Sequence, residues 1–257
     1  MNPTTKSNIS LFKYWIKERN DIYQKKEIQK LLPPWTNDPI LQKYKFTNWD
    51  RSKDRVTRYL VDNIFVGDDL GLTLHNIVAH RYCSKEETSK RIGIIKNDYK
   101  DLIAYHKEAS AYTGAFIRCH SLDEAIKTFD KIYEDRDELV RSIRKHNTLQ
   151  FAFEAMNSYK LLGRFMAWQI VCDMTLTEIL PNPSDIDDFV VLGKSARNGL
   201  AILGNPDIKT LKMHMNTRLR KHGIQMTLID IEHSLCEFYK YHKAVHQNKR
   251  PKQIYKY

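Results

Sequence analysis

Apolar side chains recur along this chain at spacings of three and four residues, which is the period of an amphipathic helix. The first such face contains Phe12, Trp15, Ile16 and Tyr23, with Arg19 in the same register. Charged and amide side chains fill the positions between them, so the pattern predicts a helix over residues 9–31. Pro33 and Pro34 follow and end it, because proline cannot continue a helix.

The same period, with cap residues, predicts further helices. Asp38 before Pro39 suits the start of a helix over 40–46, and Ser84 with Glu87 has the spacing of a capping box. Ser121 begins a long helix with acids near its start and bases near its end. Other helices are expected over residues 54–64, 72–83, 121–146, 149–159, 164–174, 183–203, 208–222 and 228–245. The chain therefore reads as an all-α protein of roughly ten helices, a single globular domain over residues 1–245 followed by a basic tail at 246–257.

The segment RFMAWQIVCDM is apolar on almost every side, which is typical of a helix buried at the centre of a bundle. It is followed at once by the turn TLTEILP, and its carboxylate, Asp173, allows two interpretations. Asp173 could cap that turn, or it could be an acid held in a cleft with a shifted pKa. The residues alone leave both open.

Composition excludes several classes. The chain has 257 residues and 42% hydrophobic side chains, which is enough for a sizeable core, yet only 9 Gly and 8 Pro for the turns of an all-β fold. It has no apolar run long enough to cross a membrane and no secretory signal, so we expect a cytoplasmic protein. Its four cysteines are scattered, which favours buried thiols. GKSARNG lacks the first glycine of a nucleotide-binding loop, and we expect neither a cofactor nor a metal.

The charge is strongly positive, with 42 Lys and Arg against 31 Asp and Glu, a formal net charge of +11. The excess is concentrated in residues 209–221 and in the tail from Lys240. Nucleic acid is the partner that such a distribution most often serves, although a solvated basic surface remains the alternative. A second basic group lies in 51–58, where Asp54 and Arg58 could pair on one helix face or the arginines could grip phosphate beside Trp49.

Three segments resemble a known family. They are ERNDIYQKKEIQKLLPPWTNDPILQKYKFTNWDRSKDRVTRYL, then LLGRFMAWQIVCDMTLTEIL with GKSARNGL, and finally IEHSLCEFYKYHKA with KRPKQIY. Together they are similar, in order, to the alpha-glutamyl/putrescinyl thymine pyrophosphorylase family, which is related to the helical domain of phage 5-hydroxymethyluracil DNA kinases. Two departures stand out. Gly193-Lys194-Ser195 replaces the family's Gly-Pro-Gly, and Arg164 follows Gly163 where a second Gly-Pro pair is common.

The resemblance implies a transferase of phage DNA hypermodification with an all-helical, DNA-glycosylase-like fold. Its partners would be double-stranded DNA carrying a modified thymine and a small amine, an amino acid or a polyamine, inside an infected bacterial host. The expected reaction replaces the phosphate of a 5-phosphomethyl-deoxyuridine with the amine after the base has left the helical stack. Two alternatives stay open: a non-catalytic DNA-binding module that partners a kinase, and an enzyme that excises the modified base.

The proposed chemistry selects residues by role. Asp173 is the expected base, with Glu237 and Asp54 as the other candidates, because the incoming ammonium must lose a proton. Arg55 and Arg197 are the expected phosphate clamp. Residues expected to contact substrate or DNA are Arg19, Trp35, Asn48, Arg51, Asp54, Thr57, Lys194, Asn198, Lys240 and Tyr241. Trp35, Trp168 or Tyr241 would line the pocket for the base.

Overall fold

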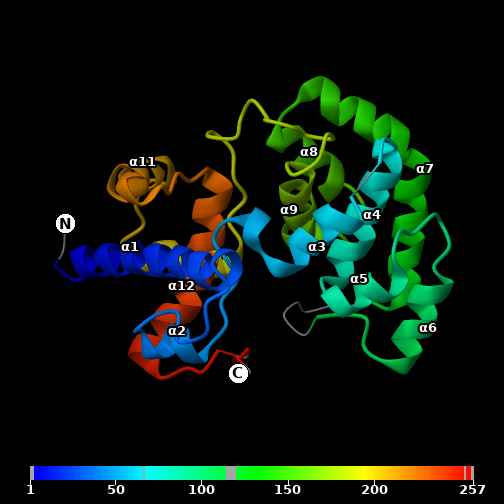
Figure 1. Cartoon of the computed structure of the whole chain (residues 1–257). Coiled ribbons are helices and arrows are strands. Elements are labelled where there is room, and N and C mark those ends of the chain that lie inside the picture. The colour runs from blue at the N-terminus through cyan, green and yellow to red at the C-terminus, as the bar shows by residue number, and fades with distance from the viewer. Residues whose placement is uncertain (1–2, 66, 114–119, 252, 256–257) are drawn as a thin grey trace. The chain divides into compact units, whose positions relative to one another are not determined.

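The computed structural model describes residues 3–65, 67–113, 120–251 and 253–255, and Figure 1 shows its course. Its α-helices are α1 (Pro3–Tyr23), α2 (Pro39–Lys43), α3 (Arg55–Asn63), α4 (Leu70–Cys83), α5 (Glu86–Ile92), α6 (Lys100–Glu108), α7 (Leu122–His146), α8 (Leu149–Asn157), α9 (Gly163–Met174), α10 (Lys194–Ile202), α11 (Ile208–Leu219) and α12 (Leu228–Gln247). A π-helical turn η1 (Gln24–Ile28) continues α1, and short 3-10 turns form η2 (Arg51–Lys53) and η3 (Arg220–His222). Across these ranges β structure is limited to one bridge, between Tyr44 and Ile254. The all-α prediction is confirmed.

The chain divides into two compact units, which we describe separately. Unit 1 consists of residues 1–54 and 190–257, and unit 2 of residues 55–189. The domain boundary expected at residue 245 stays a prediction, although α12 extends past it to Gln247. No helix within the described part of the chain is both long and apolar enough to span a bilayer.

Unit 1 is built on α12. In Figure 1, α1 crosses α12, and the crossing is filled by aromatic rings, with Phe12 5.0 Å and Trp15 6.4 Å from Phe238. On another side α10 packs against α12 at very short range. A Cβ atom added to Gly199 would lie 2.3 Å from the backbone oxygen of Leu235, so only glycine permits this approach. The start of α10 is thereby fixed beside α12.

The C-terminal segment is fastened to unit 1. After α12, the amide of Tyr255 donates to the carbonyl of Lys43 (3.1 Å), and the amide of Lys45 donates to the carbonyl of Gln253 (3.0 Å). The ring of Tyr255 packs edge-on against Trp35 at 5.4 Å. Residues 253–255 are therefore an integral part of the unit.

Unit 2 is organised around two buried helices, α4 and α9, which contact each other and are bordered by α7 and α8. Every residue of α9 from Met166 to Met174 is buried, as the apolar segment RFMAWQIVCDM predicts. Cys83 and Cys172 are buried and Cys236 is half-buried, whereas Cys119 lies outside the described residues.

Several predicted helix ends are confirmed. The Asp38 carboxylate accepts the amides of Ile40 (2.8 Å) and Leu41 (3.0 Å), with Pro39 at the first helical position of α2. Ser121 and Glu124 form the capping box of α7.

Other local predictions are wrong for identifiable reasons. Ser84 does not begin a capping box, because it ends α4 in a left-handed conformation and its hydroxyl donates to the carbonyl of Arg81. The helix expected over 183–203 begins only at Lys194. Upstream of it, the Asp185 carboxylate accepts the amides of Leu149 (2.6 Å) and Gln150 (3.0 Å), so it caps α8 and holds its own segment as a loop. The first helix gives way to the π turn after Tyr23.

Candidate functional site

Buried charged and amide side chains of unit 1 gather where α12 meets α1 and the segment before η2. We call this group the polar cluster: Arg19, Asn48, Arg51, Glu232, His233 and Glu237. All but Arg51 are less than 10% exposed, and Arg51 is partly exposed. Since charged groups are rarely buried without partners, the question is what each of them faces.

Arg51 faces His233 of α12, which in turn lies beside Glu232. Its Nη1 lies 3.5 Å from Nε2 of His233, and the same nitrogen of His233 lies 3.7 Å from Oε2 of Glu232. The Asp50 carboxylate accepts the amide of Ser52 (3.0 Å) and so caps the short turn that carries Arg51. A cation, an imidazole and a carboxylate are thus aligned at one edge of the cluster.

Glu237 is the second carboxylate of the cluster. Its Oε2 accepts the backbone amide of Thr47 (3.2 Å), and its Oε1 accepts from the ammonium group of Lys240. Burial opposes the charge on Lys240, but the neighbouring Glu237 raises the pKa of Lys240 above its usual value. Burial and the charge of Glu237 raise the pKa of Cys236 to about 12, so this thiol stays protonated at neutral pH.

Arg19 and Asn48 hold donors that the rest of the described chain does not use. Nη2 of Arg19 donates to the carbonyl of Phe46 (2.7 Å), whereas its Nε and Nη1, and Nδ2 of Asn48, have no hydrogen-bond partner among the described residues. An unmet buried donor costs about 1–3 kcal/mol. Buried donors of this kind are usually met by an ordered water molecule or by a bound ligand.

The start of α10 lies beside the same stretch of α12. Gly193 precedes the helix and provides no side-chain cap, and Ser195 in its first turn lies beside the Cys236 side chain of α12. The uncapped amides, the exposed Lys194 and the nearby Lys240 all favour negative charge. The N-terminus of α10 therefore adds a positive border to the polar cluster.

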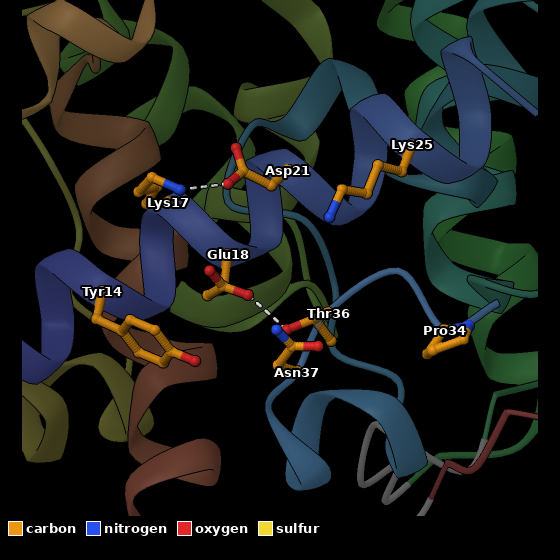
Figure 2. A pocket seen from close by; sticks show the side chains of 8 residues that line it. All are labelled: Tyr14, Lys17, Glu18, Asp21, Lys25, Pro34, Thr36 and Asn37. Carbon is orange, nitrogen blue, oxygen red and sulfur yellow. Dashed lines mark hydrogen bonds and ion pairs between the residues drawn. The ribbon is translucent and has the colours of Figure 1, made fainter. Parts of the chain in front are cut away.

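A hollow of about 380 Å³ opens on the other side of α1. Figure 2 shows Tyr14 and Glu18 of α1 pointing toward Thr36 and Asn37 of the facing segment. The Thr36 hydroxyl donates to Glu18 (2.5 Å), and Lys17 pairs with Asp21 (2.5 Å) along the rim. The full lining is Tyr14, Lys17, Glu18, Asp21, Lys25, Pro34, Thr36 and Asn37.

The wall of this hollow is hydrogen-bonded, through Asp38, to α12, the helix that carries part of the polar cluster. The Tyr241 hydroxyl donates to Asp38 (2.6 Å), and burial together with Asp38 raises the pKa of Tyr14 to about 12. Burial and the same carboxylate also raise the pKa of Tyr241, so both phenols stay protonated and act as donors. Tyr241 follows Glu237 by one helical turn, which joins hollow and cluster along α12.

Several of the residues predicted to contact substrate or DNA lie close together in unit 1. Arg19, Asn48, Arg51 and Glu237 form most of the polar cluster, with Lys240 bonded to it. Asn198 and Arg197 lie on α10, where Nη1 of Arg197 donates to the carbonyl of Leu192 (2.7 Å). Trp35 contacts Tyr255, Asp54 ends η2, and Tyr241 is buried against Asp38. The roles of all these residues stay predictions.

Four predicted residues belong to unit 2: Arg55, Thr57, Asp173 and Trp168, whose side chain is buried in α9. Asp173 has no exposed surface and forms a two-pronged pair with Arg81, from Nε to Oδ2 (2.5 Å) and from Nη2 to Oδ1 (3.0 Å). Nη2 of Arg81 also donates to the hydroxyl of Thr57 (3.0 Å). Arg55 is exposed and pairs with Glu86 (2.9 Å). The partner of Asp173 is thus Arg81, which the sequence alone did not identify.

Comparison with known proteins identifies the family to which the chain belongs. Residues 6–251 match the family model described as "5-hmdU DNA kinase, helical domain". The chain belongs to this helical-domain family. Among curated proteins it is similar to the 5-hmdU DNA kinase of Bacillus phage SP10, 24% identical over 216 residues that cover 71% of this chain. The match covers 34% of that kinase, so the chain spans about a third of its relative's length. No solved structure matches significantly.

Three residues, Arg81, Glu232 and His233, were not predicted from the sequence. Arg81 interrupts an otherwise apolar buried helix, as Asp173 interrupts another, and two opposite charges in two apolar helices are a signal for a buried pair. Glu232 and His233 stand in the motif IEHSLCEF, where consecutive charged residues break an apolar face. This signal could have drawn attention to the polar cluster.

Proposed function

We propose that this helical domain acts in the hypermodification of thymine in phage DNA, as a transferase. It would replace the phosphate of a 5-phosphomethyl-deoxyuridine with an amine, as the resemblance to the thymine pyrophosphorylase family implies. The family match supports DNA with a modified thymine as the partner. The observation that carries the proposal is the polar cluster, where Arg51 and Arg19 lie within the same unit as the carboxylate of Glu237.

The reaction needs cations that stabilise the leaving phosphate and a base that deprotonates the amine. In the first step Glu237 takes a proton from the incoming ammonium, which leaves a free amine. The amine nitrogen then bonds to the exocyclic methylene as the carbon–oxygen bond to phosphate breaks, and the leaving phosphate takes the electron pair. Arg51, Arg19 and Lys194 stabilise the charge that develops on it. The proton held by Glu237 passes to the departing phosphate, so the site returns to its starting state.

We favour Glu237 over Asp173 as the base because of access. Asp173 has no exposed surface and both of its oxygens face Arg81, so it cannot reach an amine while unit 2 is folded. Glu237 is 7% exposed, and although both of its oxygens accept hydrogen bonds, one comes from Lys240, whose side chain is 47% exposed and can turn away. The clamp of Arg55 and Arg197 stays a prediction, and in this proposal Arg51 and Arg19 carry that role.

The hollow of Figure 2 suits the amine. Glu18 and Asp21 offer carboxylates to an ammonium group, and Lys17 and Lys25 offer cations to the carboxylate of an amino acid. Its volume of about 380 Å³ leaves room for a small co-substrate. The tyrosine hydroxyls that bond to Asp38 connect this hollow to the helix that carries Glu237.

The decisive experiment follows the product. The protein is incubated with phosphorylated hydroxymethyluracil DNA and a mixture of amino acids and polyamines, and the nucleosides are analysed by mass spectrometry. We expect a nucleoside with an added amine. Glu237→Gln should reduce its yield by about 100-fold or more, since a positioned general base contributes about 10²–10⁴ in rate. Glu134→Gln, at an exposed position of α7, is the matched control and should leave the yield unchanged.

Arg51→Ala should lower transfer more than it lowers affinity for unmodified duplex. Equal losses would make Arg51 a simple backbone contact. The control is Arg220→Ala, which removes an exposed arginine of the same unit.

The family description favours a second candidate, a non-catalytic module that presents modified DNA to a kinase, because the match is to one domain of a longer protein. In that case the protein binds the modified duplex and the nucleosides stay unchanged. A third outcome, abasic sites, would mean base excision. Either result would overturn the transferase proposal.

A further inference from the structure

Unit 1 exposes a group of large aliphatic side chains at one place. Leu32 is 87% exposed and Leu31 51%, both between η1 and α2, and Ile28, the last residue of η1, is 58% exposed. Ile254, in the C-terminal segment, is 52% exposed. Single exposed leucines are common on soluble proteins, but adjacent ones at the tip of a turn indicate a contact surface.

The two segments are joined through Trp35. The indole Nε1 of Trp35 donates to the carbonyl of Leu31 (2.8 Å), and its ring contacts Tyr255, the residue after Ile254. We call Leu31 and Leu32 the leucine tip.

Backbone and side-chain bonds hold the leucine tip in place. The amide of Leu31 donates to the carbonyl of Lys25 (2.9 Å), and Nζ of Lys25 donates to the carbonyl of Trp35 (3.0 Å). A projecting apolar group that is fixed on both sides can enter a partner without first being ordered.

Lysines surround the tip. Residues 24–45 contain Lys25, Lys26, Lys30, Lys43 and Lys45. The acids of this stretch are Glu27, which pairs with Lys26 (2.9 Å), and Asp38, which is buried. Lys26 lies over the rings of both Trp35 (5.7 Å) and Tyr255 (5.8 Å), and Lys45 lies over Tyr255 (5.5 Å). The partner of this surface should therefore carry dense negative charge around an apolar interior.

Double-stranded DNA has this arrangement of charge and apolar surface, because its stacked bases lie between two rows of phosphates. We infer that the leucine tip inserts between base pairs and unstacks them while the surrounding lysines contact phosphates. Lys25 and Pro34 line the hollow of Figure 2 and also flank the tip, so the unstacking occurs beside that hollow. This inference rests on the proposed function in one respect only, which is that the partner is DNA.

The test uses duplex DNA that carries 2-aminopurine, whose fluorescence rises when the base leaves the stack. We expect the full chain to raise the fluorescence, and Leu32→Ala together with Leu31→Ala to remove at least about four-fifths of that rise, because a methyl group cannot fill a base step. Affinity should fall by less than about tenfold, since the lysines remain. Met213→Ala, which changes an apolar side chain that is 59% exposed on α11, is the matched control.

Two results would overturn the inference. In one, the double alanine variant raises the fluorescence as the unchanged chain does. In the other, the chain binds vesicles that contain phosphatidylserine through Leu31 and Leu32 and does not unstack DNA, which would make the tip a membrane contact. The assay needs neither an amine nor turnover, so a failed unstacking test and a failed transfer test are separate results.

Discussion

At the scale of single residues, unit 2 contains a buried ion pair between Arg81 and Asp173. The two side chains are 92 positions apart in sequence, and both are almost completely buried. Removing one partner leaves the other charge without compensation in a place that water does not reach. This pair therefore tests whether Asp173 has a structural or a catalytic role.

We expect Asp173→Asn to lower the free energy of unfolding by about 3–5 kcal/mol, measured by denaturant titration. Replacing both partners, as in Arg81→Met with Asp173→Leu, should recover much of that loss because no charge is then left buried. Arg55→Ala, which breaks the exposed pair with Glu86, is the control and should cost less than about 1 kcal/mol.

The variant with both Arg81→Met and Asp173→Leu also tests whether Asp173 is the catalytic base. If it is stable and transfers the amine at the normal rate, Asp173 is structural. A stable variant that has lost all transfer would support Asp173 as the base and contradict our preference for Glu237.

At the scale of elements, the contact between α10 and α12 depends on Gly199. A Cβ there would lie 2.3 Å from the oxygen and 2.9 Å from the carbon of the Leu235 carbonyl, and a helix backbone cannot move aside cheaply. We expect Gly199→Ala to destabilise the protein by about 1–3 kcal/mol, the usual range for overpacking, and to weaken transfer because Lys194 shifts with α10.

Gly71→Ala is the matched control. A Cβ at Gly71 would also meet an atom at 2.3 Å, but that atom is an oxygen of the exposed Asp137 side chain, and the next, at 2.9 Å, is the Cγ of the Arg136 side chain; side chains can move aside where a helix backbone cannot. If both alanine variants unfold at the same denaturant concentration, the close approach of α10 to α12 is not the reason for the glycine.

Helices with a long regular pattern could be predicted from sequence, and contacts between distant segments could not. Ser121 and Glu124 of α7 meet within one helical turn, so their pattern contains all the necessary information. Asp185 instead accepts amides from α8, 35 and 36 positions away, and this bond turns a predicted helix into a loop. For the same reason the candidate site was predicted residue by residue, but its grouping around α12 was not.

At the scale of the whole molecule, two buried histidines make stability depend on pH. Burial lowers the pKa of both His75 and His80 to about 4. Nε2 of His80 lies 2.9 Å from the carbonyl of Gly93, which can only accept, and Nδ1 lies 2.9 Å from the Ser89 hydroxyl. Burial therefore keeps the ring neutral at pH 7, although the carbonyl of Gly93 alone would favour its charged form.

The unfolded chain takes up these protons near pH 6.5, and the folded chain only near pH 4. Between these values the unfolded state binds more protons, so the free energy of unfolding falls as the pH falls. We expect a loss of up to about 3 kcal/mol for each histidine, measured by denaturant titration from pH 7 to pH 4. His80→Gln should flatten this dependence, whereas His146→Gln, at an exposed position, should not. An unchanged slope in the His80 variant would contradict the assignment.

The division into units also has a consequence for biosynthesis. Unit 1 is made of residues 1–54 and 190–257, so the whole of unit 2 lies between its two parts in the chain. On the ribosome, where chains are made from the N-terminus and domains fold as they emerge, unit 2 is complete before the second part of unit 1 exists. Until then α1 has no α12 to cover Phe12 and Trp15, and the nascent protein exposes this apolar face to chaperones.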